Sequence, residues 1–289
     1  MQIRYLFIRD GGLGDCLLVL PLLEAVKAAD PAADIHYMAP RGFVPLLSRS
    51  IAQPCCWPIE NAVDPSLFGP SPATDRLRPF SGFDRIYSFH GDSRFISHIS
   101  AVSPIRYLDP RPTPEYIVHH LAKIIREDGI QLVSEAPTIM TRGEASDPSS
   151  IFIHPGGGTG RKRWAIENYR PFIESLRQKH PHIKPVLLLG EAESDLKAPL
   201  ANLFDRLIEC APLVTLAELV VGRPYLGMDS GISHLAAASG AHVLALFGPT
   251  DPRIWAQRRP NYEFLAGLET LDSRAVLNRM TVLIERFEN

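Results

Sequence analysis

A pattern that occurs twice does most to limit how this chain can fold: a short apolar run, a glycine turn and a stretch with helical periodicity. In the first copy residues 5–8 lead through a turn that starts at Asp10 into residues 15–29. In the second copy residues 151–153 lead through a glycine loop into residues 168–179. Each copy is typical of a βα unit, and repeated βα units build a parallel sheet. The sequence therefore predicts an α/β protein.

The rest of each half continues this alternation of strands and helices. The remaining apolar runs predict strands at 34–38, 83–89, 186–189 and 243–247, and the remaining periodic stretches predict helices at 115–127, 193–204 and 275–286. Residues 54–79, which are rich in proline and serine, are expected to form a loop with short strands.

The length of 289 residues favours two domains, because a single core of this size is uncommon. Residues 134–150 are rich in proline, glycine, aspartate and serine, which suits an interdomain linker. We therefore predict domains at 1–140 and 150–289, with the closing helix able to pack back on the N-terminal domain. Ligands of open α/β sheets bind at the carboxyl ends of the strands.

Composition limits the partners and the compartment. A formal net charge of -2 gives no general attraction for nucleic acid, and 45% hydrophobic with 21% charged residues is typical of a globular protein. The most apolar window, residues 17–29, contains Pro21, Glu24 and Lys27 and is shorter than the roughly 20 residues that span a bilayer. The four cysteines lack zinc-site spacing, so a reduced, cytoplasmic setting is expected.

The glycine turn between Asp10 and Asp15 can be interpreted in more than one way. A dinucleotide fingerprint would need a third glycine where this chain has Leu17, which argues against a nicotinamide cofactor. The glycines could instead let a substrate approach the backbone, with Asp15 accepting a proton from a hydroxyl. Asp15 could also simply cap the following helix, and its spacing alone favours the cap.

The second glycine loop, from His154 to Trp164, ends in three consecutive cations. Such loops expose backbone N–H groups that can hold phosphate oxygens, and a neighbouring lysine can neutralise a diphosphate. The alternative is that the cations of residues 161–163 form a solvated surface run, which is the commoner fate of such clusters. Trp164 beside them favours an ordered loop.

A third segment begins at Asp229. Asp229 or Ser230 is expected to cap a helix whose first amides form an anion site. His234 lies four residues after Ser230 and therefore on the same helix face, where it could donate to a phosphate oxygen. A lone helical histidine, however, is more often structural.

Together these segments resemble the ADP-heptose:lipopolysaccharide heptosyltransferase family, glycosyltransferase family 9. The matching motifs are Gly12-Leu-Gly-Asp-Cys-Leu-Leu-Val-Leu-Pro21, His154-Pro-Gly with Lys162-Arg-Trp164, Asp229-Ser-Gly-Ile-Ser-His-Leu-Ala-Ala237 and Phe247-Gly-Pro-Thr-Asp-Pro252. The resemblance implies the GT-B fold, an α/β architecture in which two Rossmann-like, doubly wound parallel-sheet domains face a central cleft. The usual Trp-Pro is Trp164-Ala165 here, and the N-terminal half after Pro40 matches the family poorly.

By this resemblance the N-terminal domain binds the acceptor and the C-terminal domain binds the nucleotide sugar. Asp15 is the implied general base and Lys162 the second catalytic residue, with Thr159 on the diphosphate or sugar. Glu193, with Glu191 as its rival, is implied on the ribose. The donor-binding residues implied in full are Gly14, His154, Gly157, Thr159, Gly160, Glu193, Met228, Asp229, Ser230, Gly231 and His234.

The implied function is inverting, metal-independent transfer of a sugar, a heptose from ADP-heptose, to a glycan or lipopolysaccharide-core acceptor. The sequence lacks an Asp-x-Asp motif, and no cofactor is expected beside the nucleotide-sugar substrate. The alternatives are a sugar-nucleotide epimerase or hydrolase of the same fold, and a non-catalytic nucleotide-sugar binding protein.

A peripheral contact with the cytoplasmic face of the inner membrane is a further hypothesis. Related enzymes act on lipid-linked acceptors, and residues 41–49 combine apolar with basic side chains. The residues concerned are Arg41, Phe43, Val44, Leu46, Leu47 and Arg49.

Overall fold

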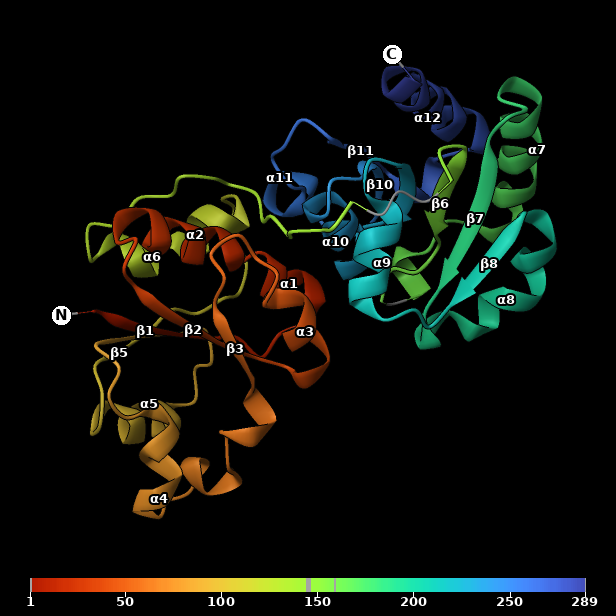
Figure 1. Ribbon diagram of the computed structural model, residues 1–289. Coiled ribbons are helices and arrows are strands. Elements are labelled where there is room, and N and C mark those ends of the chain that lie inside the picture. Colours follow the sequence, from red (N-terminus) through yellow and green to blue (C-terminus); the bar gives the residue numbers. More distant parts are fainter. Residues whose placement is uncertain (1, 144–146, 159, 289) are drawn as a thin grey trace. The chain divides into compact units, whose positions relative to one another are not determined.

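The computed structural model describes residues 2–143, 147–158 and 160–288. The chain divides into two compact units, Met1–Met140 and Thr141–Asn289, each built around one parallel sheet (Figure 1). This confirms the predicted α/β class with two parallel-sheet domains.

The sheet of the N-terminal unit has the strand order β3-β2-β1-β4-β5, and every pair in it is parallel. Its strands are β1 (Arg4–Ile8), β2 (Asp34–Ala39), β3 (Cys55–Pro58), β4 (Arg85–Ser88) and β5 (Ile105–Tyr107). The chain adds β2 and β3 on one side of β1 and β4 and β5 on the other. The loops after β1 and β4 therefore flank the point where the strand order reverses, which is where open α/β sheets bind ligands.

The helices of this unit cover both faces of its sheet. They are α1 (Leu13–Leu17), α2 (Leu20–Ala29), α3 (Val44–Leu47), α4 (Thr74–Leu77), α5 (Ser93–Ser100) and α6 (Ile117–Arg126). Figure 1 shows α2 and α6 on one face, and α4 and α5 on the other. Leu6 and Ile8 pack with Phe95 in one core, whereas Phe7 and Tyr87 meet on the opposite face with ring centroids 5.1 Å apart, because successive strand residues point to opposite sides.

The helix predicted at 15–29 is two helices in the structure. The first, α1, ends at Leu17, and α2 begins at Leu20 with Pro21 in its first turn. Proline has no N–H and suits the first turn of a helix but not its interior, which explains the break. As a result, Asp15 lies inside the short α1, close to the glycine turn.

The sheet of the C-terminal unit has the order β11-β10-β9-β6-β7-β8 and is also parallel throughout. Its strands are β6 (Ser150–His154), β7 (Lys184–Leu189), β8 (Arg206–Glu209), β9 (Pro224–Met228), β10 (His242–Phe247) and β11 (Tyr262–Ala266). The strand order reverses between β6 and β9, so the loops after these two strands flank the second candidate ligand position.

Helices cover both faces of this sheet as well. They are α7 (Tyr169–Lys179), α8 (Ser194–Leu200), α9 (Leu213–Val220), α10 (Gly231–Ala238), α11 (Pro252–Trp255) and α12 (Ser273–Glu288). The helix predicted at 193–204 is shorter, because α8 contains Pro199 and gives way to a 3-10 turn at Ala201–Leu203.

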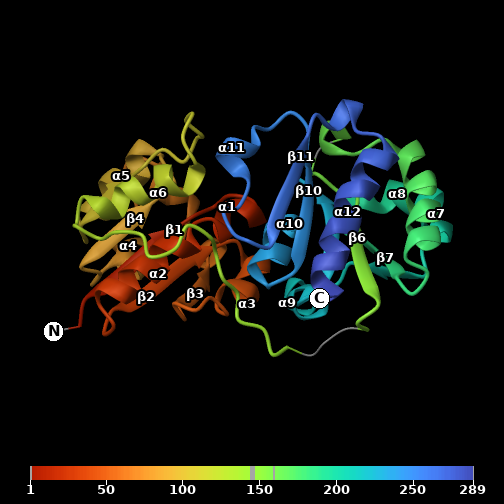
Figure 2. The ribbon, with the colours of Figure 1, turned by 90° about the horizontal axis from the view of Figure 1, so that it is seen from above.

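The closing helix α12 belongs to the core of the C-terminal unit. Val276, Met280 and Ile284 are fully buried there in one cluster with residues of α7 and the central strands. Figure 2 shows α12 alongside α7 and over the sheet. The apolar side of this helix is thus used within its own unit.

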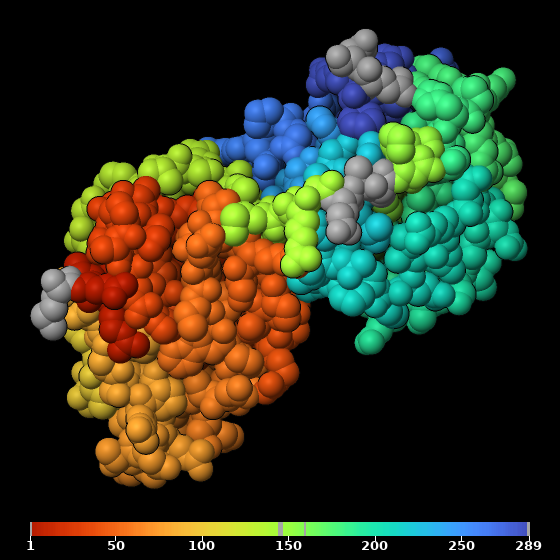
Figure 3. Space-filling view, viewed as in Figure 1, coloured from red at the N-terminus to blue at the C-terminus, as the bar shows by residue number. Residues whose placement is uncertain are grey.

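The surface of the N-terminal unit corrects one expectation. Leu46 and Leu47 are 0% exposed, so the predicted apolar contact of residues 41–49 with a membrane is wrong for these two side chains. Figure 3 shows yellow-green atoms on the surface of this view. Among the residues after α6, Val133 is 64% exposed. Within the described residues no helix is both long enough and apolar enough to span a bilayer.

Candidate functional site

An ion pair joins the two loops at the strand reversal of the C-terminal sheet. Lys162 lies in the loop after β6 and Asp229 directly follows β9, and their Nζ and Oδ2 atoms are 2.7 Å apart. The Asp229 side chain is 7% exposed and that of Lys162 is 25% exposed. A carboxylate this deeply buried needs partners, which Lys162 provides.

Two further side chains converge on Asp229. The Thr250 hydroxyl, from the loop after β10, donates to the same Oδ2 atom, and His234 Nε2 on α10 lies 4.0 Å from Oδ1. The Gln257 amide donates to the His234 carbonyl at 2.9 Å and lies 3.1 Å from Nδ1. Because that amide nitrogen can only donate, Nδ1 accepts and the ring proton belongs on Nε2, which is the nitrogen nearer Asp229.

The helix α10 starts beside this cluster. Ser230 is its N-cap, with Oγ accepting from the Ser233 N–H at 3.3 Å, and the Ser233 hydroxyl donates to the Met228 carbonyl at 2.5 Å. The first amides of a helix lack partners within the helix and carry partial positive charge, so this end suits an anion. Of the two predicted caps, Ser230 is the one that occurs, and Asp229 is left to bind Lys162.

The three cations that end the second glycine loop have three different environments. Arg161 is exposed, Lys162 turns inward to Asp229, and Arg163 donates to Asp195 at 2.5 Å and to the Ala192 carbonyl at 2.8 Å. Trp164 is 3% exposed and its Nε1 donates to the Leu271 carbonyl at 2.7 Å. Trp164 is therefore anchored at the end of the loop, and the three cations do not form a uniformly solvated run.

The glycines of this loop permit close contacts. A Cβ atom added at Gly157 would lie 2.5 Å from the Lys162 carbonyl oxygen, whereas one at Gly160 would meet nothing within 4 Å. Gly158 has a φ of +75°, a conformation that favours glycine. Thr159, a predicted donor contact, lies outside the described residues.

Glu193 forms a second buried polar group at the same edge of the sheet. Its Oε2 accepts from the Gly190 N–H at 3.0 Å and lies 3.7 Å from His154 Nε2, and the residue is 6% exposed. The His154 imidazole, with help from the Gly190 N–H, holds the pKa of Glu193 below its usual value in spite of burial. A Cβ atom at Gly156 would lie 2.2 Å from Glu193 Oε1. Glu191, the rival ribose contact, is exposed.

Two other predicted donor residues occupy different settings. The Met228 side chain is 0% exposed and belongs to the hydrophobic core, so it supports β9 from inside the unit. Gly14 lies in the N-terminal unit, in α1 beside Asp15. The structure therefore groups Lys162, Asp229 and His234 directly, and places Gly14 elsewhere in the chain.

Asp15 is held by two bonds within the N-terminal unit. Its Oδ1 accepts from Arg9 Nη2 at 2.8 Å, and its Oδ2 accepts from the Gly12 N–H at 2.9 Å. The second bond is that of a capping residue, so the cap interpretation describes a contact that does occur. The ion pair with Arg9 adds a charge partner that a simple cap does not need. A Cβ atom at Gly11 would lie 2.6 Å from Asp15 Cβ, so this approach requires glycine there.

Sequence reasoning missed Arg9, Thr250 and Gln257. Thr250 lies in the Phe-Gly-Pro-Thr-Asp-Pro segment, whose position after a strand could have indicated it. Arg9 directly follows β1 but is nearly buried, which sequence does not reveal, and Gln257 has no motif around it. In the described part of the chain no three His, Cys, Asp or Glu residues gather as they would around a metal ion.

The fold defines the class of the protein. The chain has the GT-B fold, as solved structures of glycosyltransferases show. A glycosyl transferase family 9 protein from Veillonella parvula matches with a TM-score of 0.77 and 14% identity over 99% of this chain and 98% of that one. E. coli heptosyltransferase WaaC with ADP matches with a TM-score of 0.77 and 16% identity, over 97% of this chain and 100% of that one. E. coli ADP-heptose lps heptosyltransferase II matches with a TM-score of 0.77 and 19% identity, over 99% of this chain and 100% of that one.

The sequence comparisons define the family. The sequence profile described as glycosyltransferase family 9 (heptosyltransferase) matches residues 126–274. Lipopolysaccharide heptosyltransferase 1 of Salmonella typhimurium is 33% identical over 114 residues, which cover 37% of this chain and 34% of that protein. The match thus spans about a third of the length of this curated relative. The chain belongs to glycosyltransferase family 9.

Proposed function

We propose that this protein is an inverting, metal-independent glycosyltransferase that moves a heptose from ADP-heptose to a glycan or lipopolysaccharide-core acceptor. The observation that carries the proposal is the cluster of Lys162, Asp229 and His234 at the start of α10, at the strand reversal of the C-terminal sheet. In this proposal the C-terminal unit binds the nucleotide sugar and the N-terminal unit binds the acceptor.

The donor side supplies charge for a departing diphosphate. The Lys162 ammonium has three N–H donors, so it can keep Asp229 as a partner and still bind a phosphate oxygen. The amides at the start of α10 and the Nε2 proton of His234 add neutral donors in the same region. Fixed donors of this kind at a developing anion contribute several kcal/mol to catalysis, and here they would serve in place of a metal ion.

The acceptor side supplies the base. Asp15 takes the proton of the acceptor hydroxyl while that oxygen attacks the anomeric carbon from the face opposite the diphosphate. The bond from carbon to the diphosphate oxygen breaks, ADP leaves, and the configuration at carbon is inverted. The ion pair with Arg9 fixes the orientation of the Asp15 carboxylate.

The nucleoside is assigned to the loop after β7. Glu193, buried and ionised beside the Gly190 N–H, would accept from the ribose hydroxyls through Oε1, since Oε2 is the oxygen engaged by Gly190. The choice of ADP rests on the similarity to an E. coli heptosyltransferase solved with ADP.

The test is a transfer assay with ADP-heptose and a lipopolysaccharide-core acceptor, comparing the native protein with Asp15→Asn and Lys162→Met. We expect Asp15→Asn to lower acceptor-dependent ADP release by roughly 10²–10⁴-fold while donor binding, followed by thermal shift, is kept. We expect Lys162→Met to weaken donor binding as well. The anomeric configuration of the product tests inversion, and activity in EDTA tests metal independence.

Three outcomes would contradict the proposal. Undiminished transfer by Asp15→Asn would remove the assigned base. Donor turnover at the full rate without an acceptor would favour an epimerase or a hydrolase. Donor binding without turnover under any condition would favour a binding protein.

A further inference from the structure

A histidine–carboxylate pair lies at the point where the strand order of the N-terminal sheet reverses. Asp10 lies two residues after β1 and His90 two residues after β4, and His90 Nδ1 is 2.6 Å from Asp10 Oδ2. These two strands are neighbours, and Asp10 directly precedes the glycine turn that leads to Asp15. The proposed reaction uses neither of these two side chains.

The imidazole of His90 is fixed in place on several sides. Its ring meets Phe68 and Phe95 edge-on, with ring centroids 5.5 and 5.0 Å apart. The backbone of His90 is held as well, because the Ser88 hydroxyl accepts from the His90 backbone N–H at 3.1 Å and donates to the His90 carbonyl at 3.0 Å. The two phenylalanine rings and the bond to Asp10 therefore fix the orientation of the His90 ring.

Each member of the pair favours the charged form of the other. The hydrogen bond to Asp10 raises the pKa of His90, and the same bond to His90 lowers the pKa of Asp10. Both shifts favour the pairing of a protonated imidazole with an ionised carboxylate.

Arg9 links this pair to Asp15. Its Nη2 donates to Asp15, and its Nε is buried with no hydrogen-bond partner in the described part of the chain. The Arg9 charge also contributes to the lowered pKa of Asp10, so both carboxylates lie within its influence. Arg9 therefore has donor capacity left for a second carboxylate if one became free.

Several other titratable and charged groups lie around these residues. The Cys16 thiol donates to the carbonyls of Arg9 and Gly11, and burial raises its pKa to about 12, so it stays neutral. Asp92 caps α5 and adds a small attraction for a protonated His90. Tyr37 donates to the Cys16 carbonyl, and Arg94 donates to the Phe68 carbonyl. The Tyr107 side chain lies beside Gly91.

We propose that the Asp10–His90 pair is a positioning pair for Asp15: by pairing with Asp10, His90 leaves Arg9 directed at Asp15. The inference rests on the proposed function, because it assigns the pair to the base of that reaction. His90 acts through Arg9 and Asp15, and touches neither the donor nor the reacting atoms in this scheme.

The first test is His90→Gln, read in the pH dependence of kcat/KM. This change leaves the Asp10 carboxylate without its partner, divides Arg9 between two carboxylates and places an uncompensated negative charge near Asp15. The acidic limb of the profile should move to higher pH by about half to one unit, so that kcat/KM below the limb falls about three- to tenfold.

The double variant Asp10→Asn with His90→Gln provides the rescue. It removes both charges, so Arg9 again has only Asp15 to bind, and the limb should return to its native position. A purely structural role predicts the reverse, because the double variant disrupts more contacts than the single one. In Asp10→Asn alone, the acidic limb of the kcat/KM profile should not move to higher pH. This variant still tests the inference if His90→Gln fails to fold.

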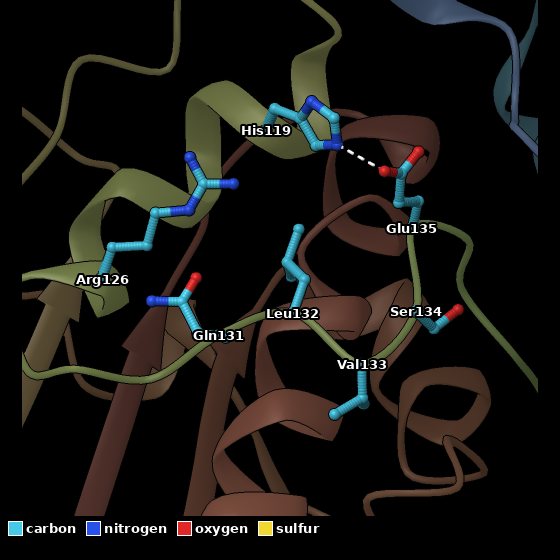
Figure 4. Close-up of a pocket in the computed structure, with 7 residues that line it drawn as sticks. All are labelled: His119, Arg126, Gln131, Leu132, Val133, Ser134 and Glu135. Atoms are coloured by element: carbon cyan, nitrogen blue, oxygen red, sulfur yellow. Dashed lines mark hydrogen bonds and ion pairs between the residues drawn. The ribbon is translucent and has the colours of Figure 1, made fainter.

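A matched control exists in the same unit. His119 Nε2 and Glu135 Oε1 form a pair of the same length, 2.6 Å, between α6 and the segment after it (Figure 4). His119→Gln removes a comparable histidine–carboxylate contact beside Arg126 and Gln131, in a region with no role in the proposed reaction. The acidic limb should stay in place in this variant.

The outcomes separate this inference from the proposed function. A folded His90→Gln variant with an unmoved limb, a double variant that is not rescued, or an equal shift in His119→Gln would each overturn the inference. If Asp15→Asn retains transfer, the proposed function itself fails. If Asp15→Asn abolishes transfer and His90→Gln moves nothing, only the positioning role fails.

Discussion

Glu193 illustrates how the fold sets the charge of one side chain. Burial alone would favour its neutral form, but His154 and the Gly190 N–H act in the opposite direction and the pKa is lowered. A carboxyl group whose pKa is lower in the folded than in the unfolded state stabilises the fold at pH values above its unfolded pKa. This contribution is lost as the pH falls through the folded pKa.

This residue allows a prediction about stability and pH. Glu193→Gln should cost about 1 kcal/mol at pH 7, since it replaces a charge-assisted hydrogen bond by a neutral one. The difference between native protein and variant should shrink as the pH falls below 4.5, the usual value for glutamate. Urea unfolding at pH 7 and at pH 4 measures it, and a difference that grows at acid pH would contradict the prediction.

Single residues were predictable where a motif named them. The motifs named Lys162, Asp229, Ser230 and His234. The structure brings them together because Lys162 and Asp229 follow the neighbouring strands β6 and β9, and the other two lie at the start of α10, which follows β9. Sequence spacing could not reveal the contact between Asp15 and Arg9, because only the fold brings these two side chains together.

At the level of elements, the sequence predicted the buried strands and missed the marginal ones. The strands β1, β6 and β10 are buried almost throughout and have continuous apolar runs. By contrast, β8 and β11 are edge strands with alternating or exposed residues. The exception is β9, which was missed although it is central and buried throughout, because Pro224 and Gly227 weaken its strand signal. Periodicity is weak in short edge strands, because only part of each strand faces the core.

The closing helix gives a prediction at this scale. Met280 is 0% exposed in the core, whereas Asn278 lies on the exposed side of the same helix. Met280→Ala should lower the free energy of unfolding by about 2–5 kcal/mol, since it leaves a cavity in a packed core. Asn278→Ala is the control and should change it by less than about 0.5 kcal/mol. Equal losses in the two variants would show that α12 does not pack as described.

For the whole molecule, composition and motif order predicted two parallel-sheet domains, and the structure confirms two such sheets, each with its own core. The acceptor is a different matter, because under the proposed function it is bound by the N-terminal unit, whose residues after Pro40 match the family poorly. After β2 and β3 the chain forms short helices and 3-10 turns rather than long periodic elements, so sequence patterns say little about the groups presented there.

Membrane association is a prediction for the whole chain. The net charge of -2 offers no general attraction for anionic lipids, and Leu46 and Leu47 are unavailable as apolar contacts. We expect no flotation with plain anionic liposomes, and flotation once a lipopolysaccharide-core lipid is included. Equal flotation without that lipid would mean that the protein binds the bilayer itself rather than the acceptor.

The position of β3 at one edge of its sheet also affects how the protein can diversify. This strand has a single neighbour, β2, and the residues that follow it run through short turns before the chain returns to the sheet at β4. A segment exchanged there with a homologue would leave the pairing of β1 with both of its neighbours intact. Under the proposed function, chimaeras spliced between β3 and β4 would therefore be a practical route to new acceptor preferences on an unchanged parallel sheet.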